Sequence, residues 1–301
     1  MIVTDNQKPK KTLKKRTKVL LCVTLPVTFL LLVFIFTPLT IYWIGGDDTT
    51  LDFEFFYLGQ NGEQNDDFDL NIVHLSDLHF PKYNVDLDEL LEETSSKNPD
   101  FIAITGDLMD TRGYVATSGV DVFLSNLAAI APVFYVDGNH DLANSNTQKL
   151  HGILRDSGAV VLENQSVTLN IRGNYILVAG LRHGSRSLTT NKTQQELEQI
   201  EYTVFLIHSP TFEIHANVYH GGGIYTTVLP NLILSGHVHG GHIRLFNRAI
   251  LCPDRFFNPP FSNGLYKQMG RHLIVSRGIG NYLFFRRVNN KPHVPVVRVR
   301  F

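Results

Sequence analysis

The chain has 301 residues, of which 43% are hydrophobic and 18% charged, so it can bury the core of one large domain or two ordinary ones. Its formal net charge of −1 argues against a general nucleic-acid-binding protein, which would be basic. It has only two cysteines, which excludes a disulfide framework and a thiolate zinc site, so any metal must be held by nitrogen and oxygen ligands.

The first 44 residues have the pattern of a membrane anchor. Residues 1–18 contain a cluster of lysines and one arginine, and residues 19–44 carry no charge and are rich in Leu, Val, Phe and Ile. An apolar run of this length can cross a hydrocarbon core of about 30 Å, which needs about 20 helical residues. The run is too long for a cleavable signal peptide and lacks a small-residue cleavage site. We therefore predict a basic tail at 1–18 and a transmembrane signal anchor at 19–44.

The charges on either side of the apolar run predict its orientation. After the run, no Lys or Arg occurs before Lys82, and residues 47–69 are acidic. The positive-inside rule then places the amino terminus in the cytoplasm and the rest of the chain outside it. We expect a single-pass protein of the cell membrane, with an acidic stalk at 45–69 and an extracytoplasmic folded domain at 70–301.

From residue 70 onward, short apolar runs alternate with segments of helical periodicity. Strands are predicted at 70–75, 101–105 and 132–136, and helices at 86–97 and 120–130. Two β-rich runs around Asn174 predict a hairpin within 159–181. Further strands are predicted at 204–207, 232–234, 273–275 and 294–299. This alternation is typical of a largely parallel sheet covered by helices.

Side chains that can bind a metal follow five of these strands. They are Asp77, His79, Asp107, Asn139, His208, His237 and His239. Ligands bind at the carboxyl edge of open α/β sheets, so we expect these residues to converge. Each block alone has a structural explanation, as a helix cap, a turn or a bend before proline. Five such coincidences are less plausible than one shared site.

The residue types indicate which ions would bind. Carboxylates together with imidazoles suit Zn, Mn or Fe better than Ca. Seven ligands are too many for one tetrahedral ion but suit two divalent ions that share a carboxylate. Two such ions carry four positive charges, and Asp77 and Asp107 return only two negative ones. The excess charge would attract a phosphate ester and lower the pKa of a bridging water.

Five blocks of sequence also carry a family resemblance. They are Asp77-Leu78-His79, Gly106-Asp107, Gly138-Asn139-His140-Asp141, His208 and Gly236-His237-Val238-His239. In this order they resemble the signature of calcineurin-like metallophosphoesterases, and residues 276–280 resemble a segment of a membrane-anchored bacterial branch of that family. The resemblance covers roughly residues 70–301. It implies a four-layer α/β/β/α sandwich in place of the simple open sheet that the alternation alone indicates.

The resemblance also implies a role for each residue. Asp77, His79 and His239 would hold one metal, Asn139, His208 and His237 the second, and Asp107 would bridge them. His140 would assist the leaving group, and Asp141 would orient the His140 ring.

The implied reaction is hydrolysis of a phosphodiester or phosphomonoester by in-line attack of a metal-bridging hydroxide, with no nucleic acid as partner. The predicted anchor suggests a lipid- or envelope-associated substrate. One alternative is a pyrophosphatase that acts on a nucleotide-linked lipid-sugar. The other, from a different class, is a non-catalytic, metal-stabilised, membrane-anchored binding protein. No feature of the sequence indicates an oligomeric state.

Overall fold

The computed structural model describes residues 24–34, 36, 49–59, 68–83, 85–188, 190, 192–216, 223–245, 248–250, 252, 258–281 and 287–301. The chain divides into two compact units, Met1–Gly46 and Asp47–Phe301. In the first unit, residues 24–34 and 36 are helical. Among the described residues, no helix has both the length and the apolar character needed to cross a bilayer. The predicted tail at 1–18 and the remainder of the predicted anchor at 19–44 lie outside the described residues.

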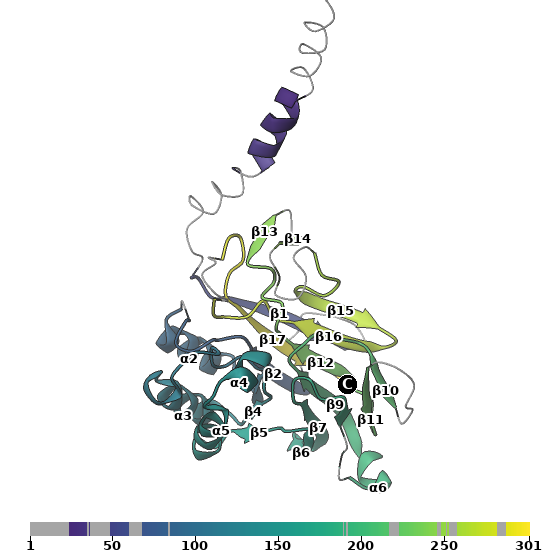
Figure 1. The fold of residues 1–301 in the computed structure, drawn as a ribbon. Helices are drawn as coiled ribbons and strands as arrows, with labels where there is room; N and C mark the ends of the chain where they lie inside the picture. The colour runs from purple at the N-terminus through teal and green to yellow at the C-terminus, as the bar shows by residue number, and fades with distance from the viewer. Residues whose placement is uncertain are drawn as a thin grey trace, which may run out of the picture. The chain divides into compact units, whose positions relative to one another are not determined.

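Two six-stranded sheets form the framework of the second unit (Figure 1). The first sheet has the order β1-β17-β2-β3-β4-β5. Its strands are β1 (Asp52–Leu58), β2 (Leu70–Leu75), β3 (Phe101–Ile104), β4 (Val133–Tyr135), β5 (Val160–Val161) and β17 (His293–Val299). Strands β2 to β5 are parallel, whereas β17 pairs antiparallel with β2 and parallel with β1.

The second sheet has the order β15-β16-β12-β9-β7-β6. Its strands are β6 (Gln165–Ile171), β7 (Asn174–Leu181), β9 (Ile200–Ile207), β12 (Leu232–Ser235), β15 (Gly264–Gln268) and β16 (Arg271–Val275). The predicted hairpin is confirmed, because β6 and β7 pair antiparallel and Ile171 is opposite Asn174. The two turn residues, Arg172 and Gly173, have φ values of 51° and 92°, as a tight two-residue hairpin turn requires.

The main core lies between the two sheets and includes Ile72, Phe101, Val178, Leu206 and Leu234. Helices α2 (Leu87–Ser96), α3 (Val120–Ile130) and α5 (Thr147–Asp156) cover the other face of the first sheet (Figure 1). Because both faces of that sheet are covered, all six residues of β2 are buried.

The two helices predicted from periodicity are confirmed as α2 and α3. The carboxylate of Asp86 caps α2 by accepting hydrogen bonds from the backbone N–H groups of Asp88 at 2.9 Å and Glu89 at 3.3 Å. The shorter elements are η1 (Val115–Thr117), α4 (Asn139–Ala143), β13 (Ile243–Leu245) and β14 (Arg248–Ile250).

The outer face of the second sheet differs from the predicted four-layer sandwich. It packs against Leu188, Phe212, Ile214 and Ile224. Most of these belong to a three-stranded sheet of β8 (Ser187–Leu188), β10 (Ile214–Ala216) and β11 (Ile224–Thr226). The described residues between β7 and β9 include one helix, α6 (Gln194–Leu197), which has no buried residue. The fold is therefore an α/β sandwich with helices over one sheet and short strands over the other.

The predicted stalk at 45–69 contains a strand of the folded domain. Asp52–Leu58 forms β1, which pairs along its whole length with β17, and Phe56 and Leu58 are buried. Its carboxylates also make ion pairs: Asp52 and Glu54 contact Arg277, and Glu54 lies 2.9 Å from His293 Nε2. The folded domain therefore begins before residue 70.

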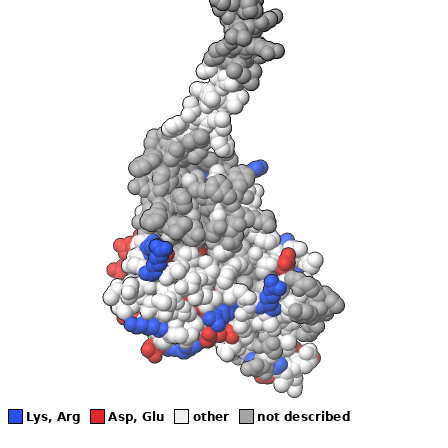
Figure 2. All heavy atoms as spheres, in the orientation of Figure 1, with Lys and Arg blue, Asp and Glu red and all other residues white. Residues whose placement is uncertain are grey.

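The charged side chains on the face shown in Figure 2 are mixed in sign. Lys and Arg side chains lie beside Asp and Glu side chains, and both kinds are scattered among uncharged residues. Among the described residues on this face, the basic side chains do not form a continuous surface.

Candidate metal centre

The seven predicted ligand residues come together from the ends of five strands. Asp77 and His79 follow β2, and Asp107 follows β3. Asn139 begins α4 directly after β4. His208 follows β9, and His237 and His239 follow β12, so the second sheet supplies three of the seven. Six of them are buried, and Asn139 is partly exposed.

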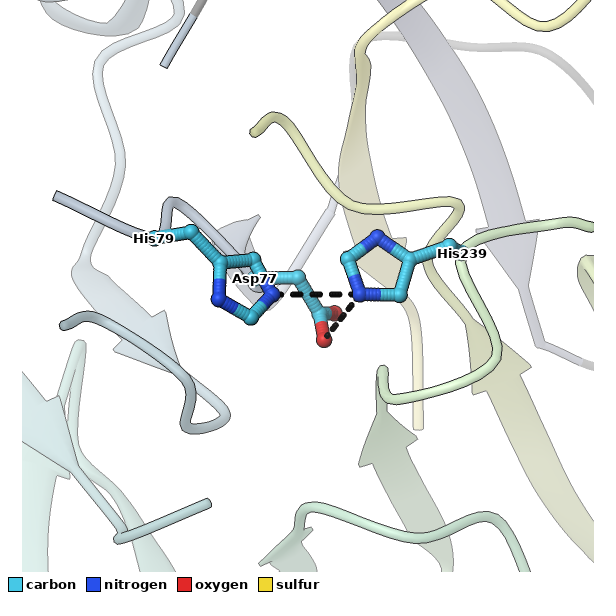
Figure 3. Close-up of side chains that lie close together, drawn as sticks. All are labelled: Asp77, His79 and His239. Carbon is cyan, nitrogen blue, oxygen red and sulfur yellow. Dashed lines mark hydrogen bonds and ion pairs between the residues drawn. The ribbon is translucent and has the colours of Figure 1, made fainter. Parts of the chain in front are cut away.

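The first group consists of Asp77, His79 and His239, whose side chains point toward one another (Figure 3). The Nε2 atoms of His79 and His239 are 3.1 Å apart. The Nε2 atom of His239 is 3.5 Å from Asp77 Oδ1. Three donor atoms from two different sheets therefore surround one small volume.

The second group consists of Asp107, His208 and His237, with Asn139 beside it. His208 Nε2 lies 3.1 Å from His237 Nδ1, 3.0 Å from Asn139 Oδ1 and 3.3 Å from Asp107 Oδ2. The same Asp107 oxygen is 3.9 Å from His79 Nε2. Asp107 is thus placed between the two groups.

The backbone at these positions is strained. Asp77, His79, Asp107, His237 and His239 all have left-handed conformations, with φ between 50° and 72°. Residues other than glycine rarely adopt this conformation, and each such residue costs on the order of 1–3 kcal/mol. The surrounding fold stabilises five strained residues here, which is typical of a functional site.

Two glycines let the backbone approach the carboxylates closely. A Cβ atom on Gly138 would collide with the carboxylate of Asp107, and one on Gly236 would collide with the side chains of Ser76 and Asp77. Beside Gly236, the backbone N–H of His237 donates to both oxygens of Asp77, at 3.0 and 3.1 Å. The glycines of the sequence blocks therefore bring backbone donors to the ligand carboxylates.

Burial controls the protonation of two imidazoles in the first group. Desolvation lowers the pKa of His79, although the charges of Asp107 and Asp77 act in the opposite direction. Burial also lowers the pKa of His239, and neighbouring histidines add to the effect. Both rings are therefore neutral near pH 7, which is the form that binds metals.

Asp107 and His208 form a buried ion pair. Burial opposes the protonated form of His208, but the Asp107 carboxylate outweighs this effect and raises the pKa of His208 to about 10. Burial would raise the pKa of Asp107, yet the charge and hydrogen bond of His208 lower it below the usual range. A cation that binds here must therefore displace the proton of His208.

This donor set fits divalent metal ions. It combines imidazole nitrogens, carboxylate oxygens and an amide oxygen, all within a few ångströms and mostly buried. In the described part of the chain, neither Asp77 nor Asp107 pairs with a lysine or an arginine. An incoming cation would therefore balance two buried carboxylates whose ion-pair partners among the described residues are histidines.

His140 lies next to the first group, with its ring centroid 4.7 Å from that of His79. Its Nδ1 atom is 2.9 Å from the Thr111 hydroxyl and 4.0 Å from Asp110 Oδ2. The role predicted for Asp141, to orient this ring, stays a prediction. The Asp141 carboxylate accepts backbone N–H bonds from Leu108, Met109 and Gly138, at 2.8 to 3.3 Å.

Asp141 therefore holds the loops that follow β3 and β4 together. Burial raises the pKa of Asp141 to about 7, and the charge of Asp107 contributes in the same direction. Sequence reasoning missed Thr111 as the partner of His140. Its position four residues after Asp107 was the only available signal.

A second cluster of similar side chains consists of Asp137, His151 and Glu163, hereafter the Asp137 cluster. Asp137 Oδ1 is 2.7 Å from His151 Nε2 and accepts a hydrogen bond from the Tyr135 hydroxyl at 3.1 Å. Two arginines border this cluster. Arg182 Nε is 3.5 Å from Asp137, and Arg155 is 3.0 Å from Glu163.

Comparison with protein families agrees with this site. Residues 70–241 match the family model of calcineurin-like phosphoesterases. The match covers more than half of the chain and contains all seven ligand residues, so this chain belongs to the calcineurin-like phosphoesterase family. The family relationship also identifies it as a metallophosphoesterase.

Individual relatives support the same assignment. The chain is 27% identical over 229 residues to the uncharacterized metallophosphoesterase YkoQ of Bacillus subtilis, covering 75% of this chain and 82% of that protein. It is 28% identical over 236 residues to YkuE, another uncharacterized metallophosphoesterase of the same organism, covering 76% and 78%. Among solved structures, a dimetal phosphatase from Danio rerio aligns with 71% of this chain and 88% of its own, with 11% identity and a TM-score of 0.40.

Proposed function

We propose that the protein hydrolyses a phosphodiester or phosphomonoester with the aid of two divalent metal ions. Asp77, His79 and His239 would hold one ion, Asn139, His208 and His237 the other, and Asp107 would contact both. The observation that carries this proposal is the position of Asp107 Oδ2, which lies 3.9 Å from His79 and 3.3 Å from His208. When bound, two such ions supply Lewis acidity and activate a water molecule for in-line attack at phosphorus.

The protein's own residues would complete the reaction. We assign His140 to the leaving group, because its ring is partly exposed and lies beside the first ligand group. The Thr111 hydroxyl lies 2.9 Å from Nδ1 of this ring and helps to orient the ring beside the first ligand group. A protonated imidazole there would donate a proton to the departing alkoxide.

The test compares two aspartates after the same chemical change. The full-length protein, purified in detergent, is stripped of metal, resupplied with Mn²⁺ and assayed with bis-p-nitrophenyl phosphate and p-nitrophenyl phosphate. We expect Asp107→Asn to lower kcat/KM by about 10³-fold or more and to reduce the bound metal measured by elemental analysis. The control is Asp121→Asn, at an exposed position of α3, which should leave both unchanged. Full activity of Asp107→Asn would contradict the proposal.

We also propose that residues 19–44 anchor the protein in the cell membrane, with its amino terminus in the cytoplasm. The support is the uncharged apolar run between a basic segment and an acidic one. In a variant that lacks Cys22 and Cys252, a cysteine at position 47 should react with a membrane-impermeant maleimide in intact cells, and one at position 8 only after lysis. The reverse labelling pattern would overturn the orientation.

A further inference from the structure

A cavity of about 170 Å³ opens beside His237. One part of its wall is apolar and consists of Val238, Cys252, Pro259, Pro260 and Phe261. The remainder is His237 itself and the Ser209-Pro210 turn that follows His208. The cavity therefore begins at the second ligand group and extends away from it along an apolar surface.

The apolar wall is held in place by neighbouring aromatic rings. Phe261 packs edge-on against Phe212, with ring centroids 5.6 Å apart, and against Tyr266 at 5.1 Å. The Tyr266 hydroxyl in turn accepts hydrogen bonds from the backbone N–H groups of Ser262 at 3.0 Å and Asn263 at 3.4 Å. These contacts fix the orientation of Phe261, so the described part of the wall is formed before a ligand binds.

The size of the cavity limits what it can contain. An apolar protein cavity of about 150 Å³ binds benzene. A cavity of about 170 Å³ therefore accepts one ring or a short branched alkyl group, and a long acyl chain would have to leave it through the opening. An apolar group that enters loses contact with water and gains contact with Val238, Cys252 and Phe261.

A second cavity, of about 240 Å³, lies near His140 and is lined by Lys82, Asp110, Arg112 and Tyr114, among others. Lys82 Nζ is 3.0 Å from Asp110 Oδ2, which is itself 4.0 Å from His140 Nδ1. Lys82, Asp110 and Arg112 thus bring charge to the cavity near His140, whereas the described residues that line the cavity beside His237 include no Lys, Arg, Asp or Glu.

We propose that the cavity beside His237 is a substrate subsite for an apolar ester substituent about the size of one ring. This inference rests on the proposed phosphoesterase function. A phosphate held by an ion at His208 and His237 would lie next to this cavity, because His237 belongs to both the ligand group and the wall. The preferred substrates are therefore phosphodiesters in which the group that is retained after cleavage is compact and apolar.

The test uses two diesters with the same leaving group, benzyl p-nitrophenyl phosphate and methyl p-nitrophenyl phosphate, and the full-length protein with Mn²⁺. We expect the wild-type kcat/KM to be about tenfold or more higher for the benzyl ester. Phe261→Ala removes the wall, and Pro260→Asp places a charge at its exposed rim. Each should reduce the benzyl-to-methyl ratio about tenfold, and because the ratio is taken within each variant, a general loss of activity does not affect it. Phe55→Ala, at an exposed position of β1, is the matched control.

A binding measurement provides a readout that does not depend on turnover. Benzylphosphonate should bind the Mn²⁺-loaded protein more tightly than methylphosphonate, and Pro260→Asp should remove the difference. Equal ratios in the wild type and both variants, with both esters still hydrolysed, would overturn the subsite alone. Hydrolysis of neither ester by the metal-loaded wild type would instead count against the proposed function.

Discussion

The candidate metal centre and the Asp137 cluster contain the same kinds of side chain but balance their charges differently. In the metal centre, Asp77 and Asp107 have only histidines as ion-pair partners among the described residues. In the Asp137 cluster, Arg182 and Arg155 already neutralise the carboxylates. A cation has a charge to balance in the first cluster but would be repelled by two guanidinium groups in the second.

The backbone of the two clusters differs as well. Five ligand residues of the metal centre have positive φ values, whereas Asp137, His151 and Glu163 have none. The Asp137 cluster is therefore a relaxed polar network that joins β4 to α5, and the metal centre is a strained arrangement of loops. The difference teaches that a group of histidines and carboxylates is a candidate site only when its charges lack internal partners and its backbone is held under strain.

The largest expected effect is on metal affinity, which should differ between variants of the two clusters. His239→Ala removes a ligand from the first group and should lower metal affinity by about 100-fold or more, since loss of an outer-sphere partner alone costs about 10–100-fold. His151→Ala removes the equivalent side chain from the Asp137 cluster and should leave affinity unchanged. Both are measured by competition with a chromogenic chelator. Similar losses in the two variants would show that charge balance is not the distinguishing property.

His140 should affect catalysis without affecting metal content. His140→Asn keeps a polar side chain beside Thr111 but cannot donate a proton as an acid. We expect kcat to fall by about 10²–10⁴-fold, while elemental analysis finds the wild-type amount of metal. If kcat is unchanged for a substrate with a poor leaving group, His140 does not act as the general acid.

The Asp137 cluster should affect stability. Asp137→Ala leaves the Tyr135 hydroxyl and the His151 ring without their buried acceptor, which costs about 1–3 kcal/mol. The midpoint of urea unfolding should decrease, with metal content and kcat/KM of the folded protein retained. Loss of metal from this variant would mean that the cluster supports the site after all.

A pH-dependent effect, confined to acid conditions, comes from His74, whose Nε2 lies 2.7 Å from the buried Thr105 hydroxyl. Burial lowers the pKa of His74 from its usual 6.5 to about 3. Below pH 6.5 the unfolded chain binds a proton that the folded protein excludes. The contribution of His74 to the free energy of unfolding is therefore fully present above pH 6.5 and decreases by about 1.4 kcal/mol per pH unit toward pH 3.

Glutamine does not titrate, so His74→Gln should remove this contribution. The free energy of unfolding of the variant should then decrease less steeply with falling pH than that of the wild type, by about 1.4 kcal/mol per pH unit. Urea unfolding between pH 7 and 4 measures the effect. Identical pH profiles of the wild type and the variant would indicate that His74 is not buried in its neutral form.

The parts of the molecule that could be predicted are those with strong local patterns. The apolar runs at 70–75 and 232–234 become β2 and β12, and the residues after them reach the same site because parallel strands end at the same edge. The position of Asp107 between the two ligand groups was implied by the resemblance of its block to the family signature. These signals require no knowledge of long-range contacts.

Other features depend on contacts that no short pattern encodes. The acidic residues around Phe53 and Phe55 make β1 difficult to predict from the sequence. Its alternation of apolar and polar residues becomes informative only once β17 lies beside it. Strands β8, β10 and β11 have two or three residues each, too few to show periodicity. Whether Asp141 or Thr111 contacts the His140 ring depends on the turn geometry, since both residues lie near His140 in the folded chain.

The pairing of β1 with β17 bears on how the protein can be shortened. The family model ends at residue 241, but β17 separates β1 from β2, and β16 lies beside β12. A fragment limited to residues 70–241 would expose the hydrogen-bonding edges of β2 and β12, the two strands that carry Asp77 and His239. It would also lose Arg277, which forms ion pairs with Asp52 and Glu54 of β1. The nearby Gly280 would be lost as well, and its N–H donates a hydrogen bond to the backbone oxygen of Asp77. A soluble fragment should therefore begin before Asp52 and extend to Phe301.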